Sequence, residues 1–328
     1  MRGAWSACRC EPRRHVGSDE MIVVAGEALV DLVIDADGAV VATLGGGPYN
    51  AARTIGRLQH PVTFLGAISD DRFGSQLFAQ LAADGVRADA TVRTTLPTTL
   101  AVAELNDQGA ATYHFYVSGT SAPSLALVPP AADAPAAVHL GTLGLVLEPM
   151  ASTVAAYLRR LPSNTLVMVD PNCRASAVTD RTAYLRRVDE SCERADVAKL
   201  STEDAAYLAP DVEPVEFARS LVVRGVTLVL LTKGEEGTLA ITADDELLVP
   251  TERIEVADTI GAGDSFGGAF LTWWLDAGLG RERLADAGLV ARAVAAAQEV
   301  AAITCQRVGA DPPRRSELSE RWQLHTNG

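Results

Sequence analysis

A carboxylate beside a run of small residues is the feature of this sequence with the clearest chemical meaning. The segment from Asp258 to Asp264 reads Asp-Thr-Ile-Gly-Ala-Gly-Asp, and it lies between a strand-like run at 247–256 and an apolar, helix-like run at 266–275. Small residues at the start of a helix leave backbone N–H groups free to bind an anion such as phosphate. A carboxylate at this place would repel a bound anion, so we expect it to take part in the reaction of that anion. We infer that Asp264 accepts the proton of a hydroxyl group that attacks phosphorus.

A structural turn and two other phosphate-binding motifs are the alternatives to this interpretation. The glycines could merely form a tight turn, with Asp264 as a helix cap. A P-loop ends in Gly-Lys-Ser/Thr, and the sequence contains no Gly-Lys pair. A dinucleotide-binding loop needs its third glycine three positions after the second, where this chain has Phe266, with Gly267 one place late. The sequence therefore disfavours a Rossmann-type oxidoreductase but does not exclude it.

A second glycine-rich segment precedes another expected helix. Residues 45–52 read Gly-Gly-Gly-Pro-Tyr-Asn-Ala-Ala. The glycines allow a ligand to approach the backbone closely, proline suits a first helical turn, and Asn50 carries both donors and an acceptor. A plain turn that starts a helix is the alternative. Asp31 follows the first strand-like run, and ligands collect at the carboxyl ends of parallel strands, so we expect Asp31 to bind hydroxyl groups.

Composition limits the classes of partner. The chain has 328 residues, 48% of them hydrophobic, and a net charge of −14. This charge argues against nucleic acids and anionic membranes as partners. The five cysteines are too scattered for a disulfide framework or a zinc site, which favours a reducing compartment such as the cytoplasm. We find no run of about 18 apolar residues and expect no membrane span.

Apolar runs and helix-period segments alternate along most of the chain. This alternation predicts an α/β fold with a mainly parallel sheet covered on both faces. We expect residues 1–20 to be an extension, 21–320 one domain, and 321–328 a tail. The expected strands are 22–26, 62–66, 137–140, 165–170, 196–200, 227–232 and 238–242; the expected helices are 48–58, 73–84, 150–161, 181–190, 203–209, 214–224, 264–277 and 281–305.

Two stretches, 28–44 and 91–117, interrupt this alternation with strand-like patterns and turn signals. In the second, Thr98 to Leu105 and Ala111 to Val117 flank Asn-Asp-Gln-Gly and are expected to pair as a hairpin. Since no helices accompany these strands, we expect them to form a small separate sheet.

The two glycine segments together resemble the two signatures of the ribokinase-like (PfkB) carbohydrate kinases, and the match extends from about Ile22 to Leu318. The resemblance implies a three-layer α/β/α sandwich with a small β-sheet lid over the sugar. It implies that Asp264 is the catalytic base and that the amides of Gly261, Ala262 and Gly263 hold the migrating phosphoryl group. In the first signature, Gly46, Gly47 and Asn50 would bind the sugar, together with Asp31.

Weaker matches to the family lie at other strand ends. Residues 170–174 read Asp-Pro-Asn-Cys-Arg, which implies that Asn172 binds the sugar and that Arg174 clamps a phosphate oxygen on the nucleotide side. Where the family usually has Asn-x-x-Glu near magnesium, this chain has Ser201 and Asp204, with Glu203 adjacent; capping of a helix by Ser201 is the alternative. The expected nucleotide contacts are Ser201, Thr232, Gly234, Gly237 and Gln298, and the possible metal contacts, through water, are Asp204 and Glu203.

The resemblance implies an ATP-dependent sugar kinase that uses Mg²⁺ and, in some relatives, a monovalent cation such as K⁺ near Gly309 and Ala310. The Gly-Glu-Ala-x-x-Asp opening at 26–31 is most similar to fructokinases and 2-keto-3-deoxygluconate kinases. No Lys or Arg occurs from Thr94 through Leu158, so the lid offers no fixed cation for an acidic sugar, and fructose is favoured. The alternatives are 2-keto-3-deoxygluconate kinase, a Rossmann-type oxidoreductase and a non-catalytic sensor. A homodimer through the lid is also possible.

Overall fold

The computed structural model describes residues 20–35, 37–105 and 111–322. Its main sheet has eight strands in the order β14-β13-β12-β11-β10-β9-β1-β4, parallel except for the two antiparallel strands β13 and β14 at one edge. The strands of this sheet are β1 (Ile22–Ala25), β4 (Val62–Leu65), β9 (Ala137–Gly141), β10 (Leu166–Asp170), β11 (Val197–Ser201), β12 (Leu228–Thr232), β13 (Thr238–Ile241) and β14 (Glu246–Val249).

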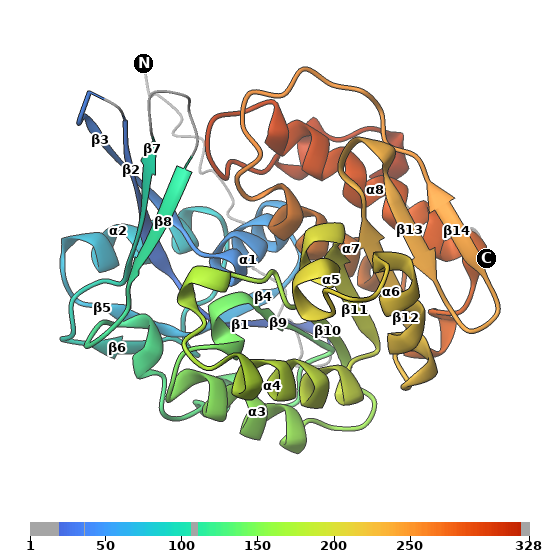
Figure 1. Cartoon of the computed structure of the whole chain (residues 1–328), viewed down its shortest axis with the longest axis horizontal. Coiled ribbons are helices and arrows are strands. Elements are labelled where there is room, and N and C mark those ends of the chain that lie inside the picture. Colours follow the sequence, from blue (N-terminus) through green and yellow to red (C-terminus); the bar gives the residue numbers. More distant parts are fainter. Residues whose placement is uncertain (1–19, 36, 106–110, 323–328) are drawn as a thin grey trace, which may run out of the picture.

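Alternate side chains of these strands enter two separate hydrophobic cores, one on each face of the sheet. In β1, Val23 and Ala25 join one core and Ile22 and Val24 the other, as the two-residue repeat of a strand requires. One face is covered by α3 (Met150–Arg160), α4 (Arg181–Arg194), α5 (Thr202–Leu208) and α6 (Pro214–Val223), and the other by α1 (Gly47–Arg57), α2 (Arg72–Ala83), α7 (Ala262–Asp276) and α8 (Ala287–Cys305) (Figure 1).

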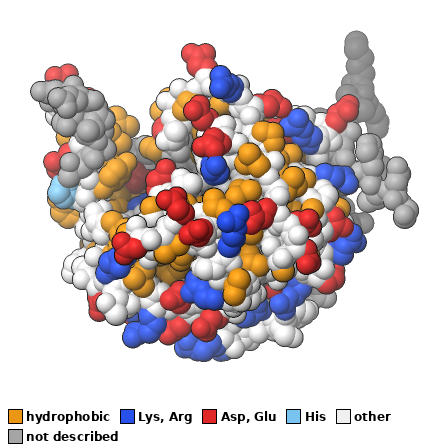
Figure 2. Space-filling view, turned by 45° about the vertical axis from the view of Figure 1, so that its right-hand side comes forward, with side chains coloured by type: hydrophobic (Ala, Val, Ile, Leu, Met, Phe, Trp, Pro, Cys, Tyr) orange, Lys and Arg blue, Asp and Glu red, His pale blue; other side chains and the backbone are white. Residues whose placement is uncertain are grey.

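A smaller sheet of four strands stands apart from these layers, at the upper left of Figure 1. Its order is β3-β2-β7-β8, with β2 (Leu29–Ile34) parallel to β7 (Leu100–Leu105), and with β3 (Val40–Gly45) and β8 (Ala111–Tyr116) antiparallel at the edges. We call these four strands the lid. Apolar side chains are exposed on it, at the left of Figure 2.

The predicted α/β class, the mainly parallel sheet, the helices on both of its faces and the separate small sheet are confirmed. The region of 91–117 is divided, however: β6 (Val92–Thr94) pairs with β5 (Ala67–Ser69) in a two-stranded sheet of its own and takes no part in the lid. The turn expected at 106–109 lies outside the described residues.

Three segment boundaries differ from the sequence expectations. The strand-like run at 247–256 ends at Val249 because Pro250 follows and has no N–H to donate. The helix expected at 281–305 begins only at Ala287, where the carboxylate of Asp286 accepts a hydrogen bond from the Leu289 amide and caps it. Trp322 is buried in a hydrophobic core, so packed structure extends into the expected tail, of which 323–328 lie outside the described residues.

Helix α8 is the one described helix that is long and apolar enough to cross a membrane. Its buried side chains, among them Val290, Val294 and Val300, pack in the same core as those of α7. Core helices of globular proteins commonly have this composition, so the length and apolarity of α8 are weak support for a membrane span.

Candidate active site

The candidate site lies where the order of the parallel strands reverses. Strand β1 has β4 on one side and β9 on the other, and ligands of open α/β sheets bind in the crevice at such a switch point. Glu27, Thr142 and Asn172 follow the carboxyl ends of β1, β9 and β10 at this place. Helices α1 and α7, which begin at the two glycine segments, pack against each other beside it.

Asp264 is the centre of the site. It lies in the first turn of α7, is 8% exposed, and its two carboxylate oxygens accept hydrogen bonds from different amides: Oδ2 from Asn50 at 3.0 Å and Oδ1 from Asn172 at 3.2 Å. Burial raises the pKa of Asp264, although the Asn50 hydrogen bond and the charges of Lys199 and Arg174 oppose the rise. A buried carboxylate with a raised pKa, held in place by two side-chain amides, is suited to accept a proton.

The turn before Asp264 has the form expected of an anion-binding helix start. Gly261 is the N-cap residue of α7 and has φ of +77°, in the left-handed region that favours glycine. The N–H groups of a first helical turn have no partner within the helix, although the Ala262 amide here donates to the Thr259 carbonyl over a long 3.3 Å. The amides of this turn and the positive end of the helix dipole therefore form one electropositive place beside the base.

Arg174 orients Asn172. Its Nη1 donates to Asn172 Oδ1 at 2.7 Å and to the Asn172 carbonyl at 3.1 Å, so the Asn172 amide nitrogen is turned toward Asp264. The charge of Arg174 also lowers the pKa of Asp31 in the lid. The charge of Arg174, which comes from outside the lid, thus acts on Asp31 as well as on Asp264, and its expected contact with a phosphate oxygen stays a prediction.

The first glycine segment brings a buried carboxyl group to the site. The Gly47 amide donates to Glu27 Oε1 at 3.0 Å, and Glu27 is 1% exposed. Gly47 also lies beside Asp264 and Asn172, where an added Cβ would come within 3.1 Å of Asp264 Oδ1. Gly46, which precedes it, is the N-cap residue of α1. Gly47 and Asn50 thus lie beside Asp264, whereas Gly46 lies against the backbone of Glu27 and Ala28.

Asp31 lies in β2 of the lid, two residues after the strand starts, and not at the end of the first strand as expected. Burial raises its pKa to about 6, against the opposing charge of Arg174. The chain enters the lid directly after Ala28, and the Asp31 carboxyl group lies near enough to Arg174 and Asp264 for both charges to act on its pKa.

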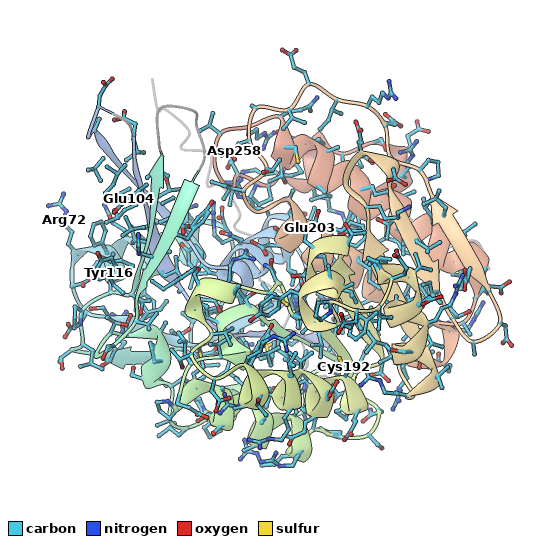
Figure 3. All side chains as sticks on the ribbon, in the orientation of Figure 1. Arg72, Glu104, Tyr116, Cys192, Glu203 and Asp258 are labelled. Carbon is cyan, nitrogen blue, oxygen red and sulfur yellow. The ribbon has the colours of Figure 1, made fainter. Side chains whose placement is uncertain are left out.

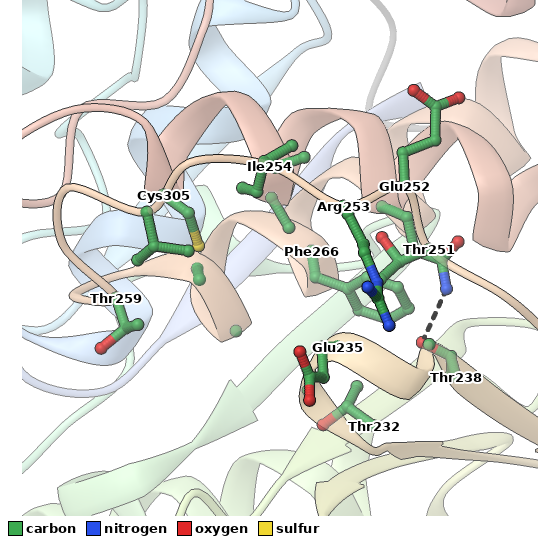
Figure 4. Close-up of a pocket in the computed structure, with 18 residues that line it drawn as sticks. Thr232, Glu235, Thr238, Thr251, Glu252, Arg253, Ile254, Thr259, Phe266 and Cys305 are labelled. Atoms are coloured by element: carbon green, nitrogen blue, oxygen red, sulfur yellow. Dashed lines mark hydrogen bonds between the residues drawn. The ribbon is translucent and has the colours of Figure 1, made fainter.

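A cavity of about 530 Å³ lies on the other side of the α7 turn. Figure 4 shows Thr232, Glu235 and Arg253 pointing toward the same space. The predicted nucleotide residues Thr232, Gly234, Gly237 and Gln298 line this cavity together with Ala262 and Gly263. Gln298 also links helix α8 to the edge strands β13 and β14. Its side-chain nitrogen donates to the Val249 carbonyl at 2.9 Å and to Thr238 Oγ1 at 3.3 Å.

Ser201 and Asp204 are engaged in the capping of α5. Ser201 Oγ accepts a hydrogen bond from the Asp204 amide, while Asp204 Oδ2 accepts from the Ser201 amide and Oδ1 from the Cys173 amide. Both carboxylate oxygens of Asp204 are thus occupied within the protein, as the capping alternative predicts. Glu203 is exposed at the start of the same helix (Figure 3). In the part of the chain that the structure describes, no three His, Cys, Asp or Glu side chains are grouped so as to hold a metal.

This geometry agrees with the comparisons to known proteins. Residues 19–317 match the model of the pfkB family carbohydrate kinases. The chain belongs to this family. A fructokinase of Rhizobium leguminosarum bv. trifolii is 33% identical over 307 residues, which cover 92% of this chain and 90% of the relative. This match favours the kinase over the Rossmann-type alternative, whose strand order 3-2-1-4-5-6 also differs from the order found here.

Solved structures resemble this kinase over nearly its whole length. A fructokinase of Xylella fastidiosa with bound ATP has a TM-score of 0.86 at 26% identity and covers 94% of this chain and 100% of its own. A fructokinase of Vibrio cholerae O395 in a fructose-, ADP- and calcium-bound form has a TM-score of 0.79 at 24% identity, with 90% of this chain and 95% of its own covered. The ribokinase-like three-layer fold is thereby confirmed.

No sequence pattern predicts a role for two buried groups of this kinase, Glu27 and Lys199. Glu27 lies within the quoted Gly-Glu-Ala opening, and its only signal was a carboxylate between small residues. Lys199 lies between apolar residues of a buried strand, Ala198 and Leu200, which is an unusual place for a lysine. A lysine among the apolar residues of an expected strand is the sequence signal that could have identified Lys199.

Proposed function

We propose that this carbohydrate kinase transfers the γ-phosphoryl group of ATP to the primary hydroxyl group of fructose. The observation that carries the proposal is the buried Asp264 carboxylate, which two amides hold between the sugar segments and the cavity lined by Ala262 and Gly263. A base in this position needs an acceptor hydroxyl on one side and a phosphoryl donor on the other. The relatives named fructokinase support fructose as the acceptor.

In the proposed reaction, Asp264 takes the proton of the sugar hydroxyl as its oxygen forms a bond to the γ-phosphorus. The bond from that phosphorus to the bridging oxygen breaks, and ADP leaves with the electron pair. The amides of Gly261, Ala262 and Gly263 stabilise the charge on the transferring group. Gly46, Gly47, Asn50 and Asp31 hold the sugar, while Arg174 fixes Asn172 against the base. Thr232, Gly234, Gly237 and Gln298 border the nucleotide.

Magnesium is the metal we expect with ATP. It prefers oxygen ligands and keeps several waters, with one or two carboxylates and the substrate phosphates completing its shell. Exposed Glu203 fits such a contact through water, whereas the Asp204 oxygens are already engaged. When bound, Mg²⁺ neutralises phosphate charge. A K⁺ site is proposed between the Asp258 loop and Gly309, whose amide donates to Asp258 Oδ2 at 2.8 Å. We place the enzyme in the cytoplasm, where ATP is supplied.

A 2-keto-3-deoxygluconate kinase is the second candidate, and Arg174 is the observation that favours it. The sequence from Thr94 through Leu158 supplies no Lys or Arg, but Arg174 brings a guanidinium group close enough to affect Asp31. An enclosed carboxylate must be paired or it loses its hydration. Arg174 already donates to Asn172, however, so we expect the neutral sugar to be preferred.

Purified enzyme with Mg²⁺ and ATP tests this proposal through coupled ADP release. Fructose should give a higher kcat/KM at neutral pH than 2-keto-3-deoxygluconate or fructose 6-phosphate. Asp264→Asn should lower kcat for fructose by about 10²- to 10⁴-fold with little change in ATP affinity. A preference for the sugar acid would favour the second candidate. Full activity of a folded Asp264→Asn protein would contradict the mechanism.

A further inference from the structure

Lys199 is a buried cation close to the proposed phosphoryl site. It occupies the middle of β11, where its neighbours Ala198 and Leu200 are fully buried. Its side chain is 4% exposed, and Nζ lies 2.8 Å from Oδ2 of Asp170, the last residue of the adjacent strand β10. Burial lowers the pKa of Lys199, but the carboxylates of Asp170, Asp204 and Asp264 outweigh this and raise it above the usual value. The ammonium group is therefore charged at neutral pH.

The ammonium group faces the first turn of α7. A Cβ added to Gly263 would lie 2.8 Å from Lys199 Nζ, so the missing side chain at this position leaves room for the lysine head group. Gly263 also lines the cavity of about 530 Å³ and is one of the residues whose amides form the anion-binding turn. Lys199 and the helix start thus present positive charge to the same place.

The hydrogen-bonding capacity of Lys199 exceeds what the described residues use. An ammonium group has three donors, and among the described residues Asp170 Oδ2 is the one hydrogen-bond acceptor found for it. Unused donors of a buried charged group are costly unless an acceptor arrives. The oxygens of a phosphoryl group held by the neighbouring amides are acceptors of the right charge.

Stability alone is a weak reason for such a pair. Replacing a buried ion pair by apolar side chains of similar volume is often neutral or stabilising, and the strand around Lys199 is apolar. The sequence has only two lysines, Lys199 and Lys233, and uses arginine for its other fixed cations. Lysine differs from arginine in being a compact point charge with rotatable donors, which suits one oxygen of a group that moves during transfer.

We propose that Lys199 is a further catalytic residue of this kinase, which donates a hydrogen bond to an oxygen of the transferring phosphoryl group from the floor of the Gly263 turn. Asp170 is the positioning residue that keeps the ammonium group charged and directed. The lysine transfers no proton; it stabilises charge while the bond to the sugar oxygen forms and the bond to ADP breaks. This inference rests on the proposed function, because it requires a phosphoryl donor in the cavity.

Nucleotide binding by titration calorimetry tests the role without relying on turnover. The variant Lys199→Met/Asp170→Asn removes the cation and leaves no unpaired buried carboxylate. Its affinity for a non-hydrolysable ATP analogue with Mg²⁺ should fall by about 10- to 100-fold, while its affinity for ADP changes by less than about twofold. Lys199→Gln, which keeps a donor for Asp170, covers the case in which the double variant does not fold, and should lower affinity for the analogue by about tenfold.

His60→Gln/Asp276→Asn is the matched control. Its two side chains also form a largely buried pair, 2.7 Å apart, but at the opposite end of α7. This variant should leave the ratio of the two affinities unchanged. Equal losses of analogue and ADP affinity in folded Lys199 variants, or no loss, would overturn the proposal. A failure of the proposed function would be visible separately, as wild-type enzyme that binds both nucleotides yet releases no ADP with any sugar.

Discussion

At the scale of single residues, Glu27 shows how a buried carboxyl group can support a reaction centre without acting in it. Oε1 accepts the Gly47 amide, and Oε2 is buried with no hydrogen-bond partner among the described residues. Burial raises the pKa of Glu27 to about 8; the charge of Asp264 adds to the rise, while backbone hydrogen bonds and Arg174 oppose it. Glu27 is therefore mostly protonated at neutral pH and adds little negative charge beside the base.

This raised pKa predicts a pH dependence of stability. A carboxyl group whose folded pKa exceeds its unfolded value of 4.5 stabilises the protein fully below about pH 4.5, and this contribution is lost as the pH rises toward about 8. Through that window the loss is about 1.4 kcal/mol per pH unit. Glu27→Gln keeps an acceptor for the Gly47 amide and cannot ionise. The difference between its free energy of unfolding and that of the wild type should therefore shift in favour of the variant as the pH rises.

Urea unfolding of both proteins at pH 5, 6, 7 and 8 measures this difference. Asp31 also has a raised pKa, but it is present in both proteins, so its contribution cancels in the comparison. Two curves of stability against pH that run parallel would show that Glu27 is ionised in the folded enzyme.

At the scale of elements, helix α1 connects the proposed sugar site to the rest of the fold. Asn50 near its start contacts Asp264, and Arg53 one turn later donates from Nε to Asp84 Oδ2 at 2.8 Å and from Nη1 to the Ala310 carbonyl at 2.9 Å. Asp84 follows α2, and Ala310 touches Gly261, where an added Cβ would lie 2.6 Å from the Ala310 Cβ. One buried guanidinium group thus connects α1, the end of α2 and the segment behind the anion-binding turn.

We expect Arg53→Met to lower the free energy of unfolding by about 3 kcal/mol, because removing one partner of a buried ion pair leaves the other poorly compensated. The matched control is Arg87→Met, whose pair with Asp89 is exposed on both sides and should cost less than about 1 kcal/mol. Denaturant unfolding at neutral pH measures both. If both variants lose a similarly small amount of unfolding free energy, Arg57, which also binds Asp84, is sufficient to compensate the Asp84 carboxylate.

At the scale of the whole molecule, the lid carries an apolar row beyond the sugar residues. Strand register places Val41, Val33, Ala103 and Tyr113 side by side across the four strands, on the same face as Asp31. Tyr116 is exposed on the opposite face of β8 (Figure 3), whereas Val41 is 62% and Tyr113 51% exposed on the face that carries Asp31. Exposed apolar patches commonly mark interfaces, so this face supports the proposal of a homodimer through the lid.

Val41→Glu should therefore convert a dimeric enzyme into a monomer, since it would bury a carboxylate in the interface. Val223→Glu is the control: Val223 is 88% exposed at the end of α6, on another part of the surface, and this variant should remain dimeric. Light scattering coupled to size-exclusion chromatography measures the mass of all three proteins. A monomeric wild type, or a dimeric Val41→Glu protein, would contradict the proposal.

The sequence predicts the layers of this molecule well because its strands are apolar runs flanked by clear helix patterns, as at Val62–Leu65 and Leu228–Thr232. It predicts Asp264 and Asn50 because each lies in a distinctive string of small residues. The places that it does not predict depend on contacts between distant segments. Lys199 lies against Gly263, and the charge of Arg174 acts on Asp31; in each pair the two residues are far apart in the sequence, so no local pattern reveals it.

The route of the chain through the lid has a consequence for how such enzymes diversify. Strands β2 and β3 are inserted between β1 and α1, and β7 and β8 between β6 and the return to β9, whereas the turn that starts α7 lies far along the chain. Mutations in the two insertions can remodel the proposed sugar surface while helix α7, which carries Asp264, keeps its packing in the core. Under the proposed assignment of the site, selection can thus act on acceptor preference and on phosphoryl transfer separately, and changes in two hairpins can provide a new acceptor.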